Sequence, residues 1–109
     1  MAEASGTAPG SSFRLKDLRL TVELLVEAVG REDGARERVA TRHGVQKSVL
    51  TDAVRRMEQF FRVSLFEGPQ RKSPTSAGRK MAAYGPRVLD EFEIFSSMLL
   101  DASQEEELH

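Results

Sequence analysis

One apolar stripe, in the segment 44–61, constrains the fold of this chain more than any other feature. Its members recur at steps of three and four residues, which places them along one side of an α-helix. They are Val49, Leu50, Ala53, Val54, Met57, Phe60 and Phe61. Gly44 stands just before the stripe, where a preceding helix needs a residue that tolerates positive φ in order to end. The segment therefore predicts a helix that follows another helix after a tight turn.

The other side of this helix is polar. It carries Gln46, Lys47, Ser48, Thr51, Asp52, Arg55, Arg56 and Gln59. A helix, a glycine turn and a second helix with a polar start form the pattern of a helix-turn-helix, whose second helix enters a DNA groove. An amphipathic helix of an ordinary bundle, with a solvated outer side, fits the same pattern. On this segment alone both interpretations are open.

The residues that follow favour the first interpretation. Val63, Leu65 and Phe66 are typical of a β-strand, residues 68–71 signal a turn, and residues 72–74 return in an extended conformation. A short hairpin directly after a helix-turn-helix is a wing, and its tip is suited to contact a phosphate backbone or a groove edge.

Four short motifs stand in a fixed order along residues 15–90. They are Leu18-Arg19, Val54-Arg55-Arg56-Met57-Glu58, Val63-Ser64-Leu65-Phe66-Glu67 and Thr75-Ser76-Ala77-Gly78. In this order and spacing they resemble the N-terminal winged helix-turn-helix of LysR-type transcriptional regulators. The DNA-binding domain of molybdate-responsive regulators has a related pattern and matches less well. The LysR resemblance implies a mostly α fold, with three helices and a short β-hairpin wing, followed by a long C-terminal dimerisation helix.

The chain departs from that family at several places. Val39-Ala40 and His43 stand where the second helix usually has paired small residues and a leucine. Asp52 stands where the family often has a polar or basic residue, and Pro74 replaces an apolar strand residue of the wing. The family's effector-binding domain is missing, so we expect a stand-alone DNA-binding domain with no evident small-molecule effector.

The formal net charge of −1 conceals two segments of opposite sign. Residues 13–85 hold 15 lysines and arginines against 9 acidic residues, a net charge of +6, whereas residues 86–109 hold one arginine against seven acidic residues, a net charge of −6. A neutral chain would argue against nucleic acid as a partner. Here the positive segment coincides with the predicted helix-turn-helix and wing, so the charge distribution favours nucleic acid as a partner.

The residue types present argue against enzymatic chemistry. The chain has no cysteine, which excludes disulfides, thiolate metal sites and thiol nucleophiles. No paired carboxylates, Ser-His-Asp spacing or glycine-rich phosphate loop can be recognised. We therefore predict no enzyme, no cofactor and no metal site. No apolar run is long enough for a membrane span and no secretory signal is present, so a cytoplasmic, nucleoid-associated protein is expected.

Two helices are expected before the polar one, at residues 13–29 and 35–43. The first has an apolar stripe of Leu15, Leu18, Val22, Leu25, Val26 and Val29. The second turns Val39, Ala40 and His43 inward, with His43 as a partly buried histidine whose ring has hydrogen-bond partners. Arg38 and Arg42 project from its other sides. They either reach a DNA phosphate or pair with Glu32, Asp33 or Glu37 on a solvated face.

The first turn of a recognition helix lies deepest in the major groove. Gln46, Lys47, Ser48 and Thr51 are therefore the candidates for contacts with base edges, because Gln suits adenine, Lys suits guanine, and Ser and Thr are versatile. Arg55 is the next candidate DNA contact.

The remaining polar residues of this region lie on the same helix and at the tip of the wing. Asp52 could accept a hydrogen bond from cytosine N4, but a pair along the helix with Arg55 or Arg56 is favoured. Arg56 is expected to brace Glu58 or Asp52 instead of contacting DNA. At the tip of the wing, Gln70, Arg71 and Lys72 are expected to face the DNA backbone.

The last helix is expected from Ser76 to about Leu100, with Thr75 as its N-cap. Its apolar residues recur at steps of three and four, in the manner of a coiled-coil seam. They are Met81, Tyr84, Val88, Phe92, Phe95 and Leu99. Gly85-Pro86 is expected to interrupt and bend the helix. The seam predicts a homodimer through Val88, Phe92, Phe95 and Leu99, whereas the alternative is a helix folded back on the first helix as part of the core.

The predicted organisation has a disordered tail at 1–12, a winged helix-turn-helix at 13–75, a dimerisation helix at 76–100 and an acidic disordered tail at 101–109. The predicted function is sequence-specific binding of double-stranded DNA, at a pseudo-palindromic site, to regulate transcription. Control would come from the concentration of the protein, from a regulatory protein partner or from occlusion of a promoter. The alternatives are an accessory DNA-binding protein of plasmid transfer, partition or recombination, and a protein-interaction module that has lost DNA binding.

Overall fold

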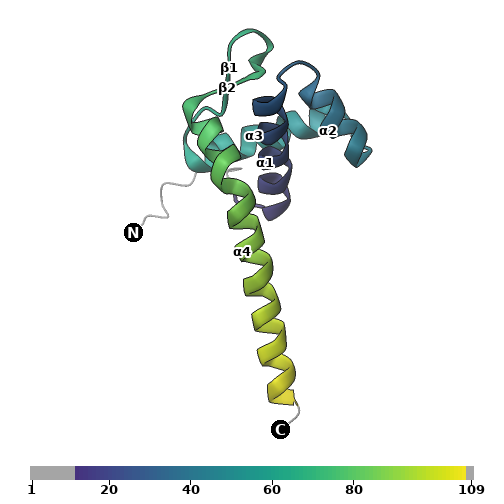
Figure 1. Cartoon of the computed structure of the whole chain (residues 1–109), viewed down its shortest axis with the longest axis vertical. Coiled ribbons are helices and arrows are strands. Elements are labelled where there is room, and N and C mark those ends of the chain that lie inside the picture. Colours follow the sequence, from purple (N-terminus) through teal and green to yellow (C-terminus); the bar gives the residue numbers. More distant parts are fainter. Residues whose placement is uncertain (1–11, 108–109) are drawn as a thin grey trace.

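The computed structural model describes residues 12–107, and the predicted tail at 1–12 lies outside this range except for Ser12. The described residues form four α-helices and one two-stranded antiparallel sheet (Figure 1). The helices are α1 (Leu15–Gly30), α2 (Ala35–His43), α3 (Lys47–Phe61) and α4 (Ser76–Glu107). The strands are β1 (Phe66–Glu67) and β2 (Ser73–Pro74), joined through a short 3-10 turn at Pro69–Arg71. The prediction of a mostly helical chain with a short hairpin is confirmed.

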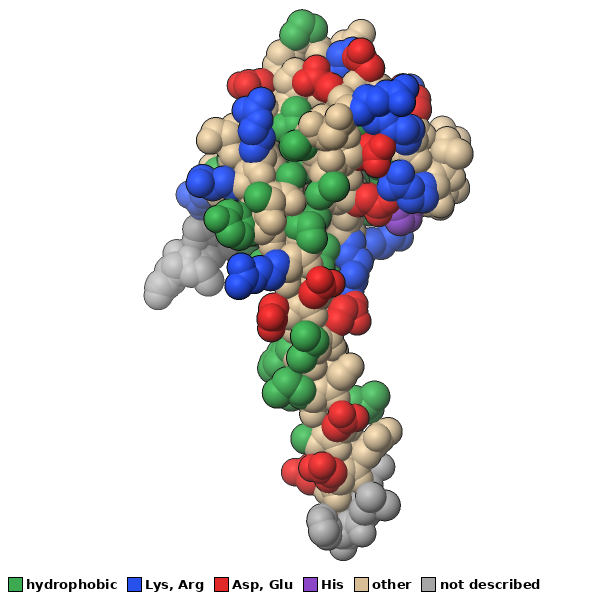
Figure 2. Space-filling model, in the orientation of Figure 1, with side chains coloured by type: hydrophobic (Ala, Val, Ile, Leu, Met, Phe, Trp, Pro, Cys, Tyr) green, Lys and Arg blue, Asp and Glu red, His purple; other side chains and the backbone are tan. Residues whose placement is uncertain are grey.

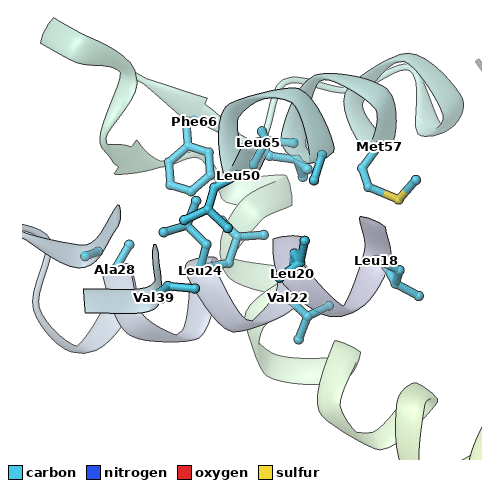
Figure 3. Packing of buried hydrophobic residues seen from close by; sticks show 14 of the residues in the cluster. Leu18, Leu20, Val22, Leu24, Ala28, Val39, Leu50, Met57, Leu65 and Phe66 are labelled. Carbon is cyan, nitrogen blue, oxygen red and sulfur yellow. The ribbon is translucent and has the colours of Figure 1, made fainter. Parts of the chain in front are cut away.

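Helix α1 lies in the middle of the fold and contacts the other three helices and β2. Its buried apolar residues pack against Leu50 and Met57 of α3 and against Leu65 and Phe66 (Figure 3). They are Leu18, Leu20, Val22, Leu24, Leu25 and Ala28. The predicted stripe was wrong at Val26 and Val29, which are exposed. Because α2, α3, α4 and β2 contact α1 on more than one side, its buried residues extend around the helix beyond the predicted stripe.

The turn between α2 and α3 follows from Gly44. Its φ is +64°, in the left-handed region, and its N–H donates to the carbonyl oxygens of Ala40 and Thr41. This geometry ends α2 as predicted, because glycine adopts it without a steric penalty. Helix α3 then buries Leu50, Ala53, Val54 and Met57. Phe60 and Phe61, which the sequence placed on the same stripe, are exposed at the end of α3, where the Phe60 ring contacts that of Phe13.

An ion pair between a buried aspartate of α1 and a half-buried arginine of α3 fixes the two helices together. The carboxylate of Asp17 is 4% exposed and accepts hydrogen bonds from Arg56 Nε at 2.8 Å and Nη2 at 3.0 Å. The hydrogen bond to Asp17 raises the pKa of Arg56. The sequence predicted Glu58 or Asp52 as the partner of Arg56, which was wrong, because α3 turns this arginine toward α1 rather than along its own surface.

The hairpin pairs Phe66 with Pro74 and Glu67 with Ser73. Leu65 and Phe66 are buried, but Val63 is exposed and precedes the strand, so the predicted strand was too long at its start. The backbone N–H of Leu65 donates to the carboxylate of Glu58 at 2.7 Å, which ties this segment to the end of α3.

Helix α4 is continuous from Ser76 to Glu107, so two predictions were wrong. Pro86 lies inside the helix without interrupting it, and residues 101–107 are helical rather than disordered. Residues 102–107 contain mostly good helix formers and neither glycine nor proline, which favours continuation of the helix. At its start the hydroxyl of Thr75 accepts a hydrogen bond from the N–H of Gly78 at 3.0 Å, which confirms the predicted N-cap.

The first half of α4 lies against α1 because two glycines leave room for close contact. A Cβ atom at Gly78 would lie 2.3 Å from the carbonyl oxygen of Leu65, and one at Gly85 would lie 2.6 Å from a methyl group of Val22. After an ion pair between Glu93 and Arg19 of α1, the second half projects away from the rest of the chain (Figure 1). We call residues 90–107 the shaft. The longest dimension of the molecule, 59 Å, follows from this arrangement.

We expect Gly78→Ala to lower the free energy of unfolding by about 1–3 kcal/mol, because the added methyl group overlaps a backbone atom that cannot move alone. The loss should appear although alanine favours a helix by about 1 kcal/mol over glycine. Gly30→Ala is the matched control, since nothing lies within 4 Å of its added Cβ. Urea unfolding measures both, and a Gly78→Ala protein as stable as the wild type would show that α4 does not pack this closely.

None of the helices formed by residues 12–107 combines the length and the apolar character that a membrane span requires.

Candidate functional site

Polar side chains gather where the start of α3, the start of α2 and the hairpin approach one another. Gln46, Lys47 and Ser48 at the start of α3 are exposed, and no side chain caps this end of the helix. The first backbone N–H groups of a helix have no partner within the helix, so an uncapped end offers donors and positive potential to a ligand. The sequence therefore placed these three residues correctly on an accessible surface.

Lys47, Thr51 and Arg55 follow one another at four-residue steps along α3. Together they line one wall of a cavity of about 530 Å³, whose other walls come from α1, α2 and the hairpin. Lys47 and Arg55 are exposed, whereas Thr51 is half-buried. Of the predicted base contacts, Thr51 is thus the one with the least accessible side chain.

Two cations on this wall of the cavity, Lys47 and Arg55, have acidic partners nearby. Lys47 Nζ lies 3.0 Å from a carboxylate oxygen of Glu37, and Arg55 Nη1 lies 3.1 Å from one of Asp52. The second pair confirms the predicted bond between Asp52 and an arginine of the same helix. The hydrogen bond from Lys47 lowers the pKa of Glu37. Both pairs are solvent-exposed, so each contributes little to stability and can open at small cost.

The two basic residues of the hairpin differ. Lys72 Nζ lies 3.0 Å from the carboxylate of Asp33, and this hydrogen bond raises the pKa of Lys72. Arg71 turns back toward the chain, where it pairs with Glu58 and donates to the carbonyl oxygen of Phe66 from Nη2 at 3.0 Å. Arg71 therefore holds the hairpin against the end of α3. Of the three predicted tip residues, Gln70 is the one with no such inward contact within the described chain.

Arg38 and Arg42 face acidic residues of α1. Arg38 Nε lies 2.6 Å from Glu27, and Arg42 pairs with both Glu23 and Glu27. The hydrogen bonds from Arg38 and Arg42 lower the pKa of Glu27. The ion-pair alternative thus describes these arginines, although the acids lie on α1 and not in the 32–37 segment that the sequence suggested.

His43 is exposed, so the prediction of an inward-facing histidine was wrong. Its Nε2 lies 2.8 Å from Glu23, whose carboxylate also pairs with Arg42. Burial raises the pKa of Glu23, but the hydrogen bonds from His43 and Arg42 outweigh this effect and leave the pKa lowered. The ring of His43 therefore has a hydrogen-bond partner, as predicted, and this partner lies on α1.

Arg36 is the residue of this region to which the sequence gave no role. It lines the cavity, and its guanidinium carbon lies 4.9 Å from the centre of the Phe66 ring. Its Nη1 donates to the carbonyl oxygen of Arg71 at 3.3 Å. The pairing of Arg36 with Phe66 joins residues 30 positions apart, so no local sequence signal could have indicated it.

The predicted dimer residues lie on α4 as exposed side chains. Met81 packs against the core, but the rest of the predicted seam is open to solvent, and all residues from 90 to 106 are exposed. The exposed members are Tyr84, Val88, Phe92, Phe95 and Leu99, with Ile94, Met98 and Leu100 beside them. Figure 2 shows hydrophobic side chains along the shaft with acidic side chains between them. The first half of α4 is therefore part of the core, and the second half is not.

Within residues 12–107 no group of three or more His, Asp or Glu side chains is placed to hold a metal ion. Comparison of the chain with models of protein families, with curated proteins and with solved structures found no match.

Proposed function

We propose that this protein binds specific sequences of double-stranded DNA as a homodimer and regulates transcription, in the cytoplasm and on the nucleoid. In this proposal α2 and α3 form a helix-turn-helix, and the hairpin 66–74 is its wing. The observation that carries the proposal is the exposed, uncapped polar start of α3 beside the hairpin. The resemblance of residues 15–90 to the LysR-type DNA-binding domain supports it.

Reading of bases would fall to the first turn of α3. The side chain of Gln46 can pair with adenine, and that of Lys47 can reach guanine once its exposed bond to Glu37 opens. The exposed hydroxyl of Ser48 can donate to or accept from a base edge. Thr51 and Arg55 follow on the same wall and would lie against the groove edge and the backbone.

Contacts to phosphates would come from the hairpin and from Arg55. Lys72 is held by an exposed ion pair that DNA can displace, whereas Arg71 is engaged in holding the hairpin. Arg38 and Arg42 are paired with α1, so we expect a smaller contribution from them than from Lys72. The net charge of +6 over residues 13–85 would draw the whole domain toward DNA.

The shaft supports dimerisation. A solvated shaft with exposed Phe92, Phe95 and Leu99 would be a marginal helix in water, since most helical stability in proteins comes from packing of an apolar side. A second copy offers the same apolar side. An antiparallel pair centred near Phe92 would place the acidic end of one helix, at 101–106, beside Arg79 and Lys80 of the other, whereas a parallel pair would place like charges together.

Replacement of a base-reading residue tests the proposal. Gln46→Ala should weaken binding to a duplex selected from a random library by about 1–3 kcal/mol, because one bidentate base contact is lost. Binding to unselected duplex should change much less. Gln59→Ala is the matched control, since Gln59 is an exposed glutamine near the other end of α3. Fluorescence anisotropy at two salt concentrations measures each protein on both duplexes.

The outcomes separate the candidate functions. Equal losses on both duplexes would contradict base reading by Gln46. Wild-type protein that binds selected and random duplexes equally would indicate an accessory DNA-binding protein instead of a regulator. Wild-type protein that binds neither duplex would leave a protein-interaction module as the function.

A further inference from the structure

The cavity between α2, α3 and the hairpin has a mixed lining. Leu24, Ala28 and Phe66 supply buried apolar surface, whereas the polar side chains around them are mostly cationic. The cationic residues are Arg36, Lys47, Arg55, Arg71 and Lys72, and the acidic ones are Glu32 and Glu37. Its volume of about 530 Å³ lies in the range of small-molecule sites.

Four of these five cations are neutralised by a carboxylate, as described above for Lys47, Arg55, Arg71 and Lys72. Arg36 differs from them. Within the described chain it forms no ion pair, and its Nε is buried without a hydrogen-bond partner. A buried donor without an acceptor is unfavourable, and more so when it belongs to a charged group.

The surroundings of Arg36 leave its charge without a directly bonded carboxylate among the described residues. Its guanidinium is stacked on the Phe66 ring, and its one direct hydrogen bond goes to a backbone carbonyl. Burial lowers the pKa of Arg36, the nearby charge of Arg71 lowers it further, and the more distant carboxylates of Glu37 and Glu58 only partly offset these effects. Arginine nevertheless stays charged in proteins, so the cavity keeps a partly desolvated positive charge.

We propose that this cavity binds a tetrahedral oxyanion of the size and charge of phosphate, with Arg36 as its central ligand. The planar guanidinium presents donors in a fixed fork that matches phosphate oxygens, and a turn of the Arg36 side chain toward the cavity would bring its buried Nε to the acceptor that an anion supplies. The apolar lining strengthens such a bond, since it excludes water from one side. Lys47 and Lys72 on the rim can turn from their exposed carboxylates toward the anion.

The oxyanion has two possible sources. One is a phosphodiester of the DNA backbone, in which case the site deepens the proposed function and rests on it. The other is a free phosphorylated small molecule, which would give the protein an effector that its sequence does not reveal. The site itself does not depend on DNA binding, so it can be tested with inorganic phosphate alone.

Titration of the wild-type protein with sodium phosphate, against sodium chloride at matched ionic strength, tests the site. The NMR signal of the Arg36 Nε–H group should shift saturably in millimolar phosphate and remain in place in chloride. Arg36→Met should weaken phosphate binding about tenfold or more, the equivalent of one charge-assisted hydrogen bond. Arg14→Met removes the same charge from an exposed position before α1, outside the cavity, and should leave the affinity within about twofold.

Two results would overturn the proposal. One is an Arg36 Nε–H signal that phosphate does not shift more than chloride does. The other is an equal loss of affinity in Arg36→Met and Arg14→Met, which would indicate attraction by overall charge alone. If Arg36→Met fails to fold, as circular dichroism would show, Arg36→Lys decides instead. It keeps the charge but lacks the fork, so unchanged phosphate affinity would contradict the assigned role of the guanidinium.

A short DNA duplex distinguishes the two sources. If a backbone phosphate occupies the site, duplex DNA should shift the same Arg36 signal, and phosphate should compete with DNA in the wild type but not in Arg36→Met. If DNA binds and leaves that signal unmoved while phosphate shifts it, the site takes a free oxyanion. Failure of DNA binding altogether would contradict the proposed function and leave the phosphate titration as the test of the site.

Discussion

Replacing Arg56 by alanine is expected to lower the free energy of unfolding by about 3–5 kcal/mol, the typical cost of breaking a buried ion pair from one side. The substitution leaves the carboxylate of Asp17, which is 4% exposed, without either of its two hydrogen bonds from arginine. Urea-induced unfolding followed by circular dichroism measures the change. For a domain of this size, such a loss is a large part of the total stability.

Two further variants test whether the loss comes from the unpaired carboxylate of Asp17. Arg55→Ala removes the adjacent arginine, whose bond to Asp52 is exposed, and should cost less than about 1 kcal/mol. The double variant Asp17→Leu with Arg56→Met removes both charges and should recover most of the stability, because no buried charge is left unpaired. If the double variant were as unstable as Arg56→Ala, the loss would have to come from packing and not from the carboxylate.

The substitution Phe95→Asp is expected to convert a dimer into a folded monomer. Each large apolar side chain buried between two shafts contributes roughly 1.5–3 kcal/mol, and a symmetric pair gains this at every position twice. A charge in the seam would be removed from water near the shaft of the second copy, which is unfavourable. Size-exclusion chromatography coupled to light scattering measures the mass. Affinity for a duplex with two half-sites should fall far more than affinity for one half-site, because the link between the two DNA-binding heads is lost.

Ser97→Asp is the matched control for this prediction. Ser97 is an exposed residue of the shaft two positions from Phe95, and at about 100° per residue it lies nearly on the opposite side of the helix. This variant should remain a dimer. A wild-type monomer at micromolar concentration, or a Phe95→Asp protein that stays dimeric, would show that the shaft is not the dimer contact.

Much of the fold could be predicted from local patterns. Gly44 ended α2 where a left-handed residue was expected, and Thr75 capped α4, since both signals act within a few residues of sequence. The bounds of α2 were predicted from the same kind of pattern. The continuity of α4 was not predicted, because proline is costly inside a helix. Pro86 is nevertheless accommodated within α4, next to Gly85, which packs tightly on α1.

The candidate site was predicted less completely than the fold. The exposed start of α3 followed from helical periodicity, which assigns a side to every residue. The pair of Asp52 and Arg55 within α3 followed too, but partners on other elements did not, because Arg56 with Asp17 and Arg36 with Phe66 are brought together across 39 and 30 positions by packing. The inward positions assigned to His43, Val26 and Val29 failed for a related reason, since periodicity does not show how many neighbours a helix has.

The central position of α1 has a consequence for the order in which the chain can fold. Helix α1 is synthesised first, yet part of its buried side is covered by α4, and the ion pair between Arg19 and Glu93 joins residues 74 positions apart. Closing so long a loop costs conformational entropy before the contact returns any stability. Until α4 arrives, Val22 and Leu25 lack the neighbours that cover them. The predicted boundary between residues 75 and 76 therefore separates the DNA-binding part from the dimerisation helix in function, but not in folding. The first half of α4 is needed to complete the apolar core of the domain.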